Sequence, residues 1–415
     1  MITTINNKHN KLNFSNEREQ SQACLNSAKH EKNQRRKVLN VPNLRFKEFQ
    51  EEWIKYKIKD VLSIGNGRDY KHLSNGEIPV FGTGGYMTSV DECLYDGETT
   101  FIGRKGSINK PFYYNGKFWT VDTLFYTHSF NGITPKFTYC LFQTINWLKY
   151  NEASGVPSLS KDTIEKIKIK IPGLEEQNKI AKLMFALDER IATQSKIIDK
   201  LQSLIKGMED NLLDNPLWKK TYLRSFMQFF PTNSLSWEQL SYDEGEIRNL
   251  HYGLIHGFQT RGINSASLPM IKNEAVPKQY TLCQVGDVAF ADASEDTGEI
   301  AKSVEFVDTI EGDTICGLHT IHGHDIKNRT VVGFKGFAFN SRYFHNQIKR
   351  LAQGTKVFSI TANNLSSCYV YLPDLETQKA IVELLKAYEA QLIVSRKTLK
   401  QYEKQKQYLL RQMFI

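Results

Sequence analysis

The sequence has 415 residues, 40% hydrophobic and 24% charged, which is typical of a protein with two or three globular domains. A mean hydropathy of −0.45 and the lack of an apolar run of about 18 residues exclude a membrane-spanning helix, and the first residues lack the apolar core of a secretory signal. The net charge of +9 permits a nucleic-acid partner without establishing one, because the excess is concentrated in the two terminal segments, 1–39 and 378–415, each with eight Lys or Arg against three acids.

Residues 1–39 are rich in Asn, Lys, Gln and Ser and contain a single aromatic residue, so we expect a disordered basic arm. A start-site extension without function is the alternative. A first globular domain is expected over 40–173. It opens with a strand-like stretch after Trp53, and the segment Gly97–Ile102 has the pattern of a core strand.

Three loops rich in small residues in this first domain are candidates for contact with a ligand. The Gly-rich segment Gly82–Tyr86 allows close backbone approach. The segment Gly103–Ser107 offers Arg104, Lys105 and a hydroxyl on a turn, which suit guanine edges and phosphates. Ser154–Ser158 forms the third loop. The alternative for each is a glycine turn with solvated charges.

A short alternating strand at 166–171 ends at Pro172 and is followed by Leu-Glu-Glu-Gln, which predicts a helix start. From Ile180 onward, apolar residues recur with 4,3,4,3 spacing and no internal proline. The pattern predicts one continuous helix of about 37 residues within 174–214, roughly 55 Å long.

A second strand-rich domain is expected over 215–377. It is predicted to open near Trp237, and Gly286–Ala291 repeats the Gly-acid-x-x-Phe pattern of the first domain. Here the candidate loop Tyr252–Arg261 mixes aromatic, amide and cationic groups. Asp292–Asp296 follows the core strand where Arg104 follows it in the first domain. These acids are candidates for cytosine N4, or turn and capping residues.

The strand–proline–helix element then recurs, with Pro373 lying 201 residues after Pro172, and a second helix is expected over 378–415. Its apolar spacing is in register with the first helix. A narrow seam of this length needs a partner helix, so we predict that the two copies pair as an antiparallel coiled coil. Packing of each seam on its own globular domain is the alternative. The predicted seam residues are Ile180, Met184, Leu187, Ile191, Ile198, Leu201, Ile381, Leu385, Tyr388, Leu392, Leu399 and Tyr402.

Recognisable catalytic motifs are missing from the sequence. Six cysteines are scattered without a CxxC pair, which argues against a zinc site or disulfide framework and fits a reducing cytoplasm. The cluster His319, His322 and His324 lacks a neighbouring Cys or carboxylate motif, so no metal site is predicted. Phosphate-loop, S-adenosylmethionine-loop and nuclease motifs are likewise missing. We therefore expect no catalytic residues and no cofactor in this chain.

The expected fold is α+β: two strand-rich globular domains separated by two long helices, as a pseudo-two-fold internal repeat. Two similar heads on a rigid helix pair can each meet one half of a DNA site about one helical turn apart, and divergent heads make that site asymmetric. The candidate DNA-binding residues are Gly82, Thr83, Gly84, Gly85, Tyr86, Arg104, Lys105, Ser107, Ser158, Tyr252, His256, Gln259, Thr260, Arg261, Ser294 and Lys356.

These features resemble the specificity subunit of type I restriction–modification enzymes over residues 40–415, essentially the whole expected folded chain. The resemblance rests on the duplicated element Pro-x-Leu-Glu-x-Gln-x-x-Ile at 172–180 and 373–381, followed in each copy by a long helix. Supporting motifs are Leu44-Arg45-Phe46, Phe81–Gly85, Ile102–Ser107 and Tyr252-Gly253 with His256.

The resemblance implies a non-catalytic subunit whose two target-recognition domains each read half of a bipartite, asymmetric site in double-stranded DNA. It implies that the helices set the spacing and dock methyltransferase subunits, expected to be two, and that restriction subunits complete the complex. S-adenosylmethionine, ATP and Mg²⁺ would belong to those partners. A coiled-coil scaffold with two ligand-binding heads, and a DNA enzyme of another type, stay open as alternatives.

Overall fold

The computed structural model describes residues 40–258, 260–308 and 312–415. These residues form two compact units: unit 1 comprises 40–187 with 405–415, and unit 2 comprises the described part of 188–404. The predicted basic arm, 1–39, and the candidate Gln259 lie outside the described residues. Among the described residues, no helix is both long and apolar enough to cross a membrane.

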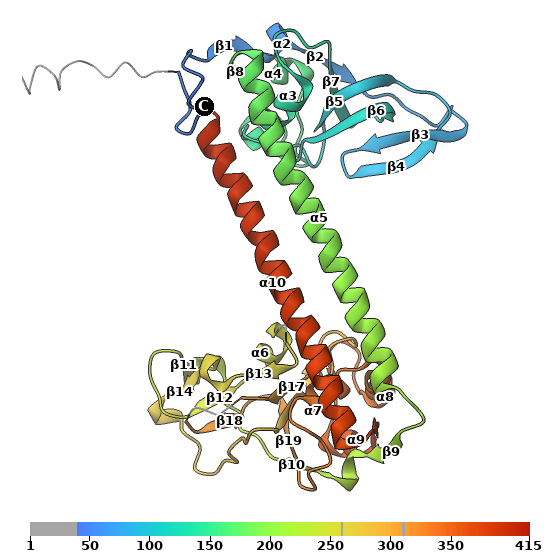
Figure 1. Ribbon diagram of the computed structural model, residues 1–415, viewed down its shortest axis with the longest axis vertical. Helices are drawn as coiled ribbons and strands as arrows, with labels where there is room; N and C mark the ends of the chain where they lie inside the picture. The colour runs from blue at the N-terminus through green and yellow to red at the C-terminus, as the bar shows by residue number, and fades with distance from the viewer. Residues whose placement is uncertain (1–39, 259, 309–311) are drawn as a thin grey trace, which may run out of the picture. The chain divides into compact units, whose positions relative to one another are not determined.

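Unit 1 is built on one six-stranded sheet with the order β2-β7-β5-β6-β3-β4. The predicted core strand lies within β5, which pairs antiparallel with both β6 and β7 and buries Phe101 completely. In Figure 1 the β3–β4 hairpin extends outward at the edge of this sheet. The elements are β1 (Ile54–Lys57), α2 (Ile58–Val61), β2 (Ser63–Asn66), β3 (Asn75–Gly82), β4 (Gly85–Val90), β5 (Tyr95–Gly103), β6 (Phe112–Thr120), β7 (Leu124–His128), α3 (Pro135–Phe142), η1 (Trp147–Tyr150), α4 (Lys161–Lys166) and β8 (Lys168–Ile171).

Unit 2 contains a five-stranded sheet, β10-β19-β15-β17-β13, and a four-stranded sheet, β11-β14-β12-β18. Its elements before the second long helix are β9 (Lys219–Tyr222), η2 (Leu223–Ser225), β10 (Met227–Phe230), η3 (Trp237–Gln239), β11 (Leu240–Ser241), β12 (Arg248–Leu250), α6 (Tyr252–Gly257), β13 (Gly262–Ile263), η4 (Ser265–Ser267), β14 (Met270–Ile271), η5 (Asn273–Ala275), β15 (Val288–Ala291), β16 (Ala293–Ser294), β17 (Ser303–Phe306), β18 (Thr314–Cys316), β19 (Thr320–Asp325), α7 (Phe334–Ala338), α8 (Arg342–Leu351), β20 (Phe358–Ser359), α9 (Ala362–Ser367) and β21 (Tyr369–Leu372).

The two units share a core topology. In unit 1 the order β2-β7-β5-β6 is antiparallel throughout, and β10-β19-β15-β17 in unit 2 repeats it. The central strands are the two that carry the Gly-acid-x-x-Phe pattern, and Phe290 is buried like Phe101. The fold is therefore α+β, with a duplicated strand-rich domain, as the sequence predicts.

The repeated Gln after each proline has the same bonding role in both units. In unit 1, Gln177 is fully buried, accepts a hydrogen bond from Thr134 N (2.9 Å) and donates to the carbonyls of Gly132 and Pro172. In unit 2, Gln378 makes the same three bonds, to Val331 N and to the carbonyls of Arg329 and Pro373. One amide side chain thus fixes the helix start against a neighbouring loop.

The two long helices are α5 (Leu174–Leu213) and α10 (Leu375–Met413), 40 and 39 residues long, slightly longer than predicted. In unit 1, Met184 of α5 and Met413 of α10 belong to one core. In unit 2, Gln194 Nε2 of α5 donates to Ser395 O of α10 at 3.3 Å. The start of one helix thus lies beside the end of the other, which makes the pair antiparallel, and none of the twelve predicted seam residues is exposed.

The predicted opening of the second domain at Trp237 is wrong. Ser236 and Gln239 form a capping box there, which closes a single 3₁₀ turn in place of a strand. The strand that corresponds to β1 is β9, directly after Trp218. It pairs antiparallel with β21, as β1 pairs with β8.

Candidate nucleic-acid interface

The loop after the core strand of unit 1 is tied to the segment that precedes β8. Leu159 N donates to Arg104 O (2.9 Å), and Gly106 N donates to Pro157 O (2.8 Å). Lys105 and Ser158 face each other in an isolated antiparallel bridge. Two loops that are about 50 residues apart in the sequence thus form one surface, which contains the candidates Arg104, Lys105 and Ser158.

The Gly-rich turn between β3 and β4 lies next to this surface. A Cβ placed on Gly106, which has a φ of +81°, would lie 3.9 Å from Thr83 Oγ1. Gly85 also has a positive φ, +104°, and added Cβ atoms at Gly84 and Gly85 would meet nothing within 4 Å. Gly85 and Gly106 therefore serve backbone conformation, and Gly84 and Gly85 leave the turn open to a ligand. Tyr86 is exposed beyond them.

We call Gly82–Tyr86, Arg104–Ser107 and Ser158 together the unit 1 loop cluster. Its two cationic side chains are exposed, and the guanidinium of Arg104 stays near the protein through a 3.3 Å hydrogen bond to Asp122 O and a 6.0 Å approach to the Phe125 ring. The cationic side chains of such a surface can donate hydrogen bonds to phosphates and to the edges of bases. The structure brings all nine candidates of this unit into one region.

Arg68 is a cationic residue at this cluster that was not predicted from the sequence. Its N–H donates to Thr120 O (2.8 Å), and Thr120 Oγ1 donates to Phe81 O, beside the Gly-rich turn. The Arg68 side chain is exposed. The residue lies in an irregular segment between β2 and β3, so neither spacing nor a glycine pattern marks it in the sequence.

Unit 2 has an equivalent surface with different side chains. Ile360 N donates to Asp292 O (3.0 Å), the counterpart of the bond from Leu159 to Arg104. The following residues form the β16–β20 pair, in which Ser294 faces Phe358. Lys356 is exposed in the loop that leads into β20. The candidates Ser294 and Lys356 are therefore close to the position that Arg104 and Lys105 occupy in unit 1.

A histidine and an aromatic ring complete this second surface. His319 Nδ1 and Asp292 Oδ1 are 3.1 Å apart, and the Tyr252 and His319 rings are in edge contact with centroids 5.3 Å apart. Tyr252 and His256 lie on the short helix α6, so the predicted loop is wrong for 252–257. The His251 side chain caps this helix by accepting a hydrogen bond from Gly253 N. His319 was predicted neither as a metal ligand nor as a DNA contact.

The remaining candidates of unit 2 are engaged elsewhere within it. Arg261 lies 3.6 Å from Glu209 of α5, and its backbone N–H donates to Glu389 of α10. These residues line a groove of about 680 Å³. His256 lies 3.4 Å from Glu299, whose pKa a hydrogen bond from Lys302 lowers although burial opposes it. Thr260 Oγ1 donates to Gly262 O. Arg261 thus contacts the helix pair.

The three histidines of the cluster 319–324, which were predicted not to form a metal site, contact two different carboxylates. His322 and His324 both bind Asp287, whereas His319 binds Asp292. However, His322 also lies beside Cys283 and Cys316, which the cysteine spacing did not indicate.

Comparisons with known proteins agree with this duplicated arrangement. A family described as "Type I restriction modification DNA specificity domain" matches residues 50–203 and again 270–404. The type I restriction enzyme MjaVIII specificity subunit of Methanocaldococcus jannaschii is 26% identical over 76% of each chain. A putative MjaX specificity subunit from the same organism is 26% identical over 88% of this chain and 93% of its own.

Among solved structures, the S subunit of a type I restriction–modification system from M. genitalium has the same fold. It superposes with a TM-score of 0.62 over 90% of this chain and 99% of its own, at 14% sequence identity. A chain from a structure of type I system assembly and conformational transition gives a TM-score of 0.52 over 88% of this chain.

Proposed function

Because this chain belongs to the family of type I restriction-modification DNA specificity proteins, we propose that it is the DNA-recognition subunit of a restriction–modification complex. Each strand-rich domain reads one half of a bipartite site in double-stranded DNA. The chain binds and positions DNA, and the chemistry belongs to its partner subunits.

One observation carries this proposal: the two copies place different side chains on the same backbone scaffold. The bond from Leu159 to Arg104 recurs as the bond from Ile360 to Asp292, so equivalent loops present a cation in one unit and an acid in the other. A guanidinium suits the acceptors of guanine, whereas a carboxylate accepts from cytosine N4. Two such surfaces select two different half-sites, which makes the whole site asymmetric.

The helix pair sets the distance between the half-sites in this proposal. At 1.5 Å per residue, the 40 residues of α5 measure about 60 Å. The contact between the two helices at Gln194 and Ser395 supports this spacing role. The outer faces of the pair dock methyltransferase subunits, two if each half of the pseudo-repeat binds one, and restriction subunits complete the complex.

The proposed assignment of DNA recognition to this chain and of catalysis to its partners also assigns the cofactors to the partners. S-adenosylmethionine belongs to the methyltransferase subunits, which methylate adenine, and ATP and Mg²⁺ belong to the restriction subunits. This chain has no assigned catalytic residue in the proposal.

The test is selection of DNA from a random duplex library by the chain in complex with its methyltransferase partner, at two salt concentrations. We expect two unlike half-sites separated by a fixed spacer, with affinity that falls as salt rises because phosphate contacts release counterions. Lack of any salt-dependent DNA affinity would contradict the proposal and favour a scaffold role.

A further inference from the structure

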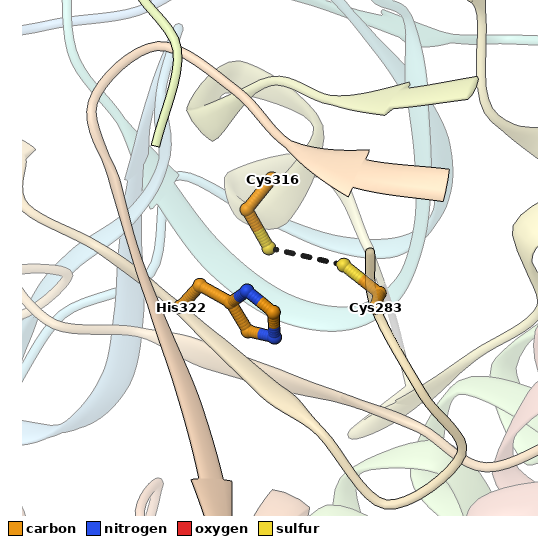
Figure 2. Close-up of side chains that lie close together, drawn as sticks. All are labelled: Cys283, Cys316 and His322. Carbon is orange, nitrogen blue, oxygen red and sulfur yellow. Dashed lines mark hydrogen bonds between the residues drawn. The ribbon is translucent and has the colours of Figure 1, made fainter. Parts of the chain in front are cut away.

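Two cysteines and a histidine from three separate segments of unit 2 meet in its interior. Cys316 ends β18, His322 lies on β19, and Cys283 lies in the segment between β14 and β15, where its N–H donates to Thr314 O (2.8 Å). Their ligand atoms all lie within 4.8 Å of one another. Figure 2 shows one ring nitrogen of His322 facing the two sulfur atoms.

The orientation of His322 is fixed from its other side. Its Nε2 lies 2.7 Å from Asp287 Oδ2, which leaves Nδ1 as the nitrogen that faces the cysteines. Asp287 is itself held by Gln284 N (2.8 Å) and by His324 Nδ1 (2.5 Å). Metal-binding histidines commonly have such a carboxylate behind them, which fixes the ring and raises the basicity of the ligand nitrogen.

The distance between the two sulfur atoms fits shared coordination. Cys283 Sγ and Cys316 Sγ are 3.6 Å apart. Two thiolates on a tetrahedral Zn²⁺, each at about 2.3 Å, have sulfur atoms about 3.8 Å apart. A disulfide needs a distance of about 2.05 Å between its sulfur atoms, so the segments that carry Cys283 and Cys316 would have to move toward each other to form one.

We propose that Cys283 Sγ, Cys316 Sγ and His322 Nδ1 form a Zn²⁺-binding site in the second strand-rich domain, with Asp287 as the residue that orients His322. On binding, both thiol protons pass to solvent, and the resulting Zn²⁺–dithiolate unit is neutral, which suits a buried position. Three protein ligands leave the fourth tetrahedral position of zinc to a water molecule.

Such a site would add a connection between parts of unit 2 that already share a hydrophobic core. Cys283 and Cys316 belong to one small core, together with residues of β15 and β17. Two of the ligands come from different sheets, since β18 with Cys316 belongs to the four-stranded sheet and β19 with His322 to the five-stranded sheet. We therefore infer that the metal links one sheet to the other, independent of whether the chain recognises DNA.

The test measures bound metal on the full-length chain, purified without added metal. Elemental analysis after dialysis is expected to find about one zinc ion per chain in the natural protein. Replacement of zinc by Co²⁺ is expected to give the visible absorption of thiolate-bound tetrahedral cobalt. Cys283→Ser and Cys316→Ser should each abolish both signals, and His322→Gln should weaken Co²⁺ binding.

The matched control is Cys368→Ala, a change at another buried free cysteine of unit 2 outside the cluster. It should keep the full zinc content. A second measurement needs no variant and therefore holds even if the variants fail to fold. In the natural protein, a chelator should make Cys283 and Cys316 reactive to alkylation and should lower the melting temperature. Natural protein that lacks zinc, fails to bind Co²⁺, or contains a Cys283–Cys316 disulfide would overturn the proposal.

Discussion

Arg104 and Asp292 occupy equivalent positions in the two loop scaffolds, yet they carry opposite charges. The positions are 188 residues apart, whereas the residues that bond to them, Leu159 and Ile360, are 201 apart. The sequence repeat has the second offset only. The Gly-acid-x-x-Phe pattern pairs the two loops in the sequence, and the folded structure adds the backbone bond that each loop receives, from Leu159 or from Ile360.

Replacing Arg104 with Ala should weaken recognition of one half-site only. The lost guanidinium would cost about 1–3 kcal/mol of discrimination at the base it contacts. Methylation or binding measured on duplexes with each half-site permuted separately checks this. Lys47→Ala, at an exposed lysine of the same unit, is the control and should leave both half-sites unchanged. Equal loss at both half-sites would contradict the assignment.

Replacing Gln177 with Leu should destabilise unit 1 by about 2–4 kcal/mol, because it removes the partner of one buried and two partly buried backbone groups. Hydrogen exchange of the full chain should show faster exchange in α3 and β8. Asn178→Leu, at the exposed neighbouring position, should have little effect. Unchanged protection in the Gln177 variant would mean that the repeated Gln is dispensable.

The structure brings the unit 1 candidates together but not all of those of unit 2, and the DNA contacts of both sets stay predictions. The nine unit 1 candidates lie in or next to short segments that contain glycine, and glycine is a signal that the local sequence shows. In unit 2, Arg261 contacts Glu209 and Glu389 of the long helices. These residues are far from Arg261 in the sequence, so a local sequence pattern does not predict the contacts. The approach of Cys283, Cys316 and His322 was missed for the same reason.

At the scale of elements, long periodic segments were predicted well and short ones poorly. The spacing of apolar residues identified α5 and α10 to within a few residues because it persists over many turns. The turn at Trp237 and the helix at 252–257 are each decided by one capping interaction, which outweighs the local composition.

The stability of unit 2 should depend on pH, because α5 and α10 carry buried or partly buried carboxyl groups beside Arg261. Burial raises the pKa of Glu389 to about 7, and it also raises the pKa of Glu209. As pH rises from about 4.5 to 7, the unfolded chain releases the Glu389 proton first, so stability should fall by about 1–3 kcal/mol over this interval. Urea unfolding at several pH values measures the fall.

Glu389→Gln should remove most of that pH dependence, whereas Glu403→Gln, at an exposed position of the same helix, should preserve it. A pH profile of the Glu389 variant that matches the natural protein would show that this carboxyl ionises in the folded state as easily as in the unfolded state.

The spacing role of the helices predicts the effect of lengthening both together. Seven residues inserted after Gln194 and after Ser395, which face each other, should keep the seam in register and add about 10 Å. The preferred spacer should then lengthen by about 3 base pairs. The same insertion in the exposed loop at Leu217 is the control and should leave the spacer unchanged. An unchanged spacer in the double insertion would refute the spacing role.

For the whole molecule, the decisive signal in the sequence was the repeat of strand, proline and long helix. Its constant offset predicted both the duplicated domains and the helix pair, and the family match falls on the same two halves. Which bases each half reads depends on a few exposed side chains on variable loops. Sequence periodicity carries no information about them.

The most direct test of the central claim is single-molecule mapping of adenine methylation across the host genome, with this gene present and deleted. We predict a bipartite, asymmetric motif with a fixed spacer that disappears when the gene is deleted. A methylation pattern that is identical in the two strains, while the chain is expressed together with its methyltransferase partner, would contradict the proposed role in DNA recognition.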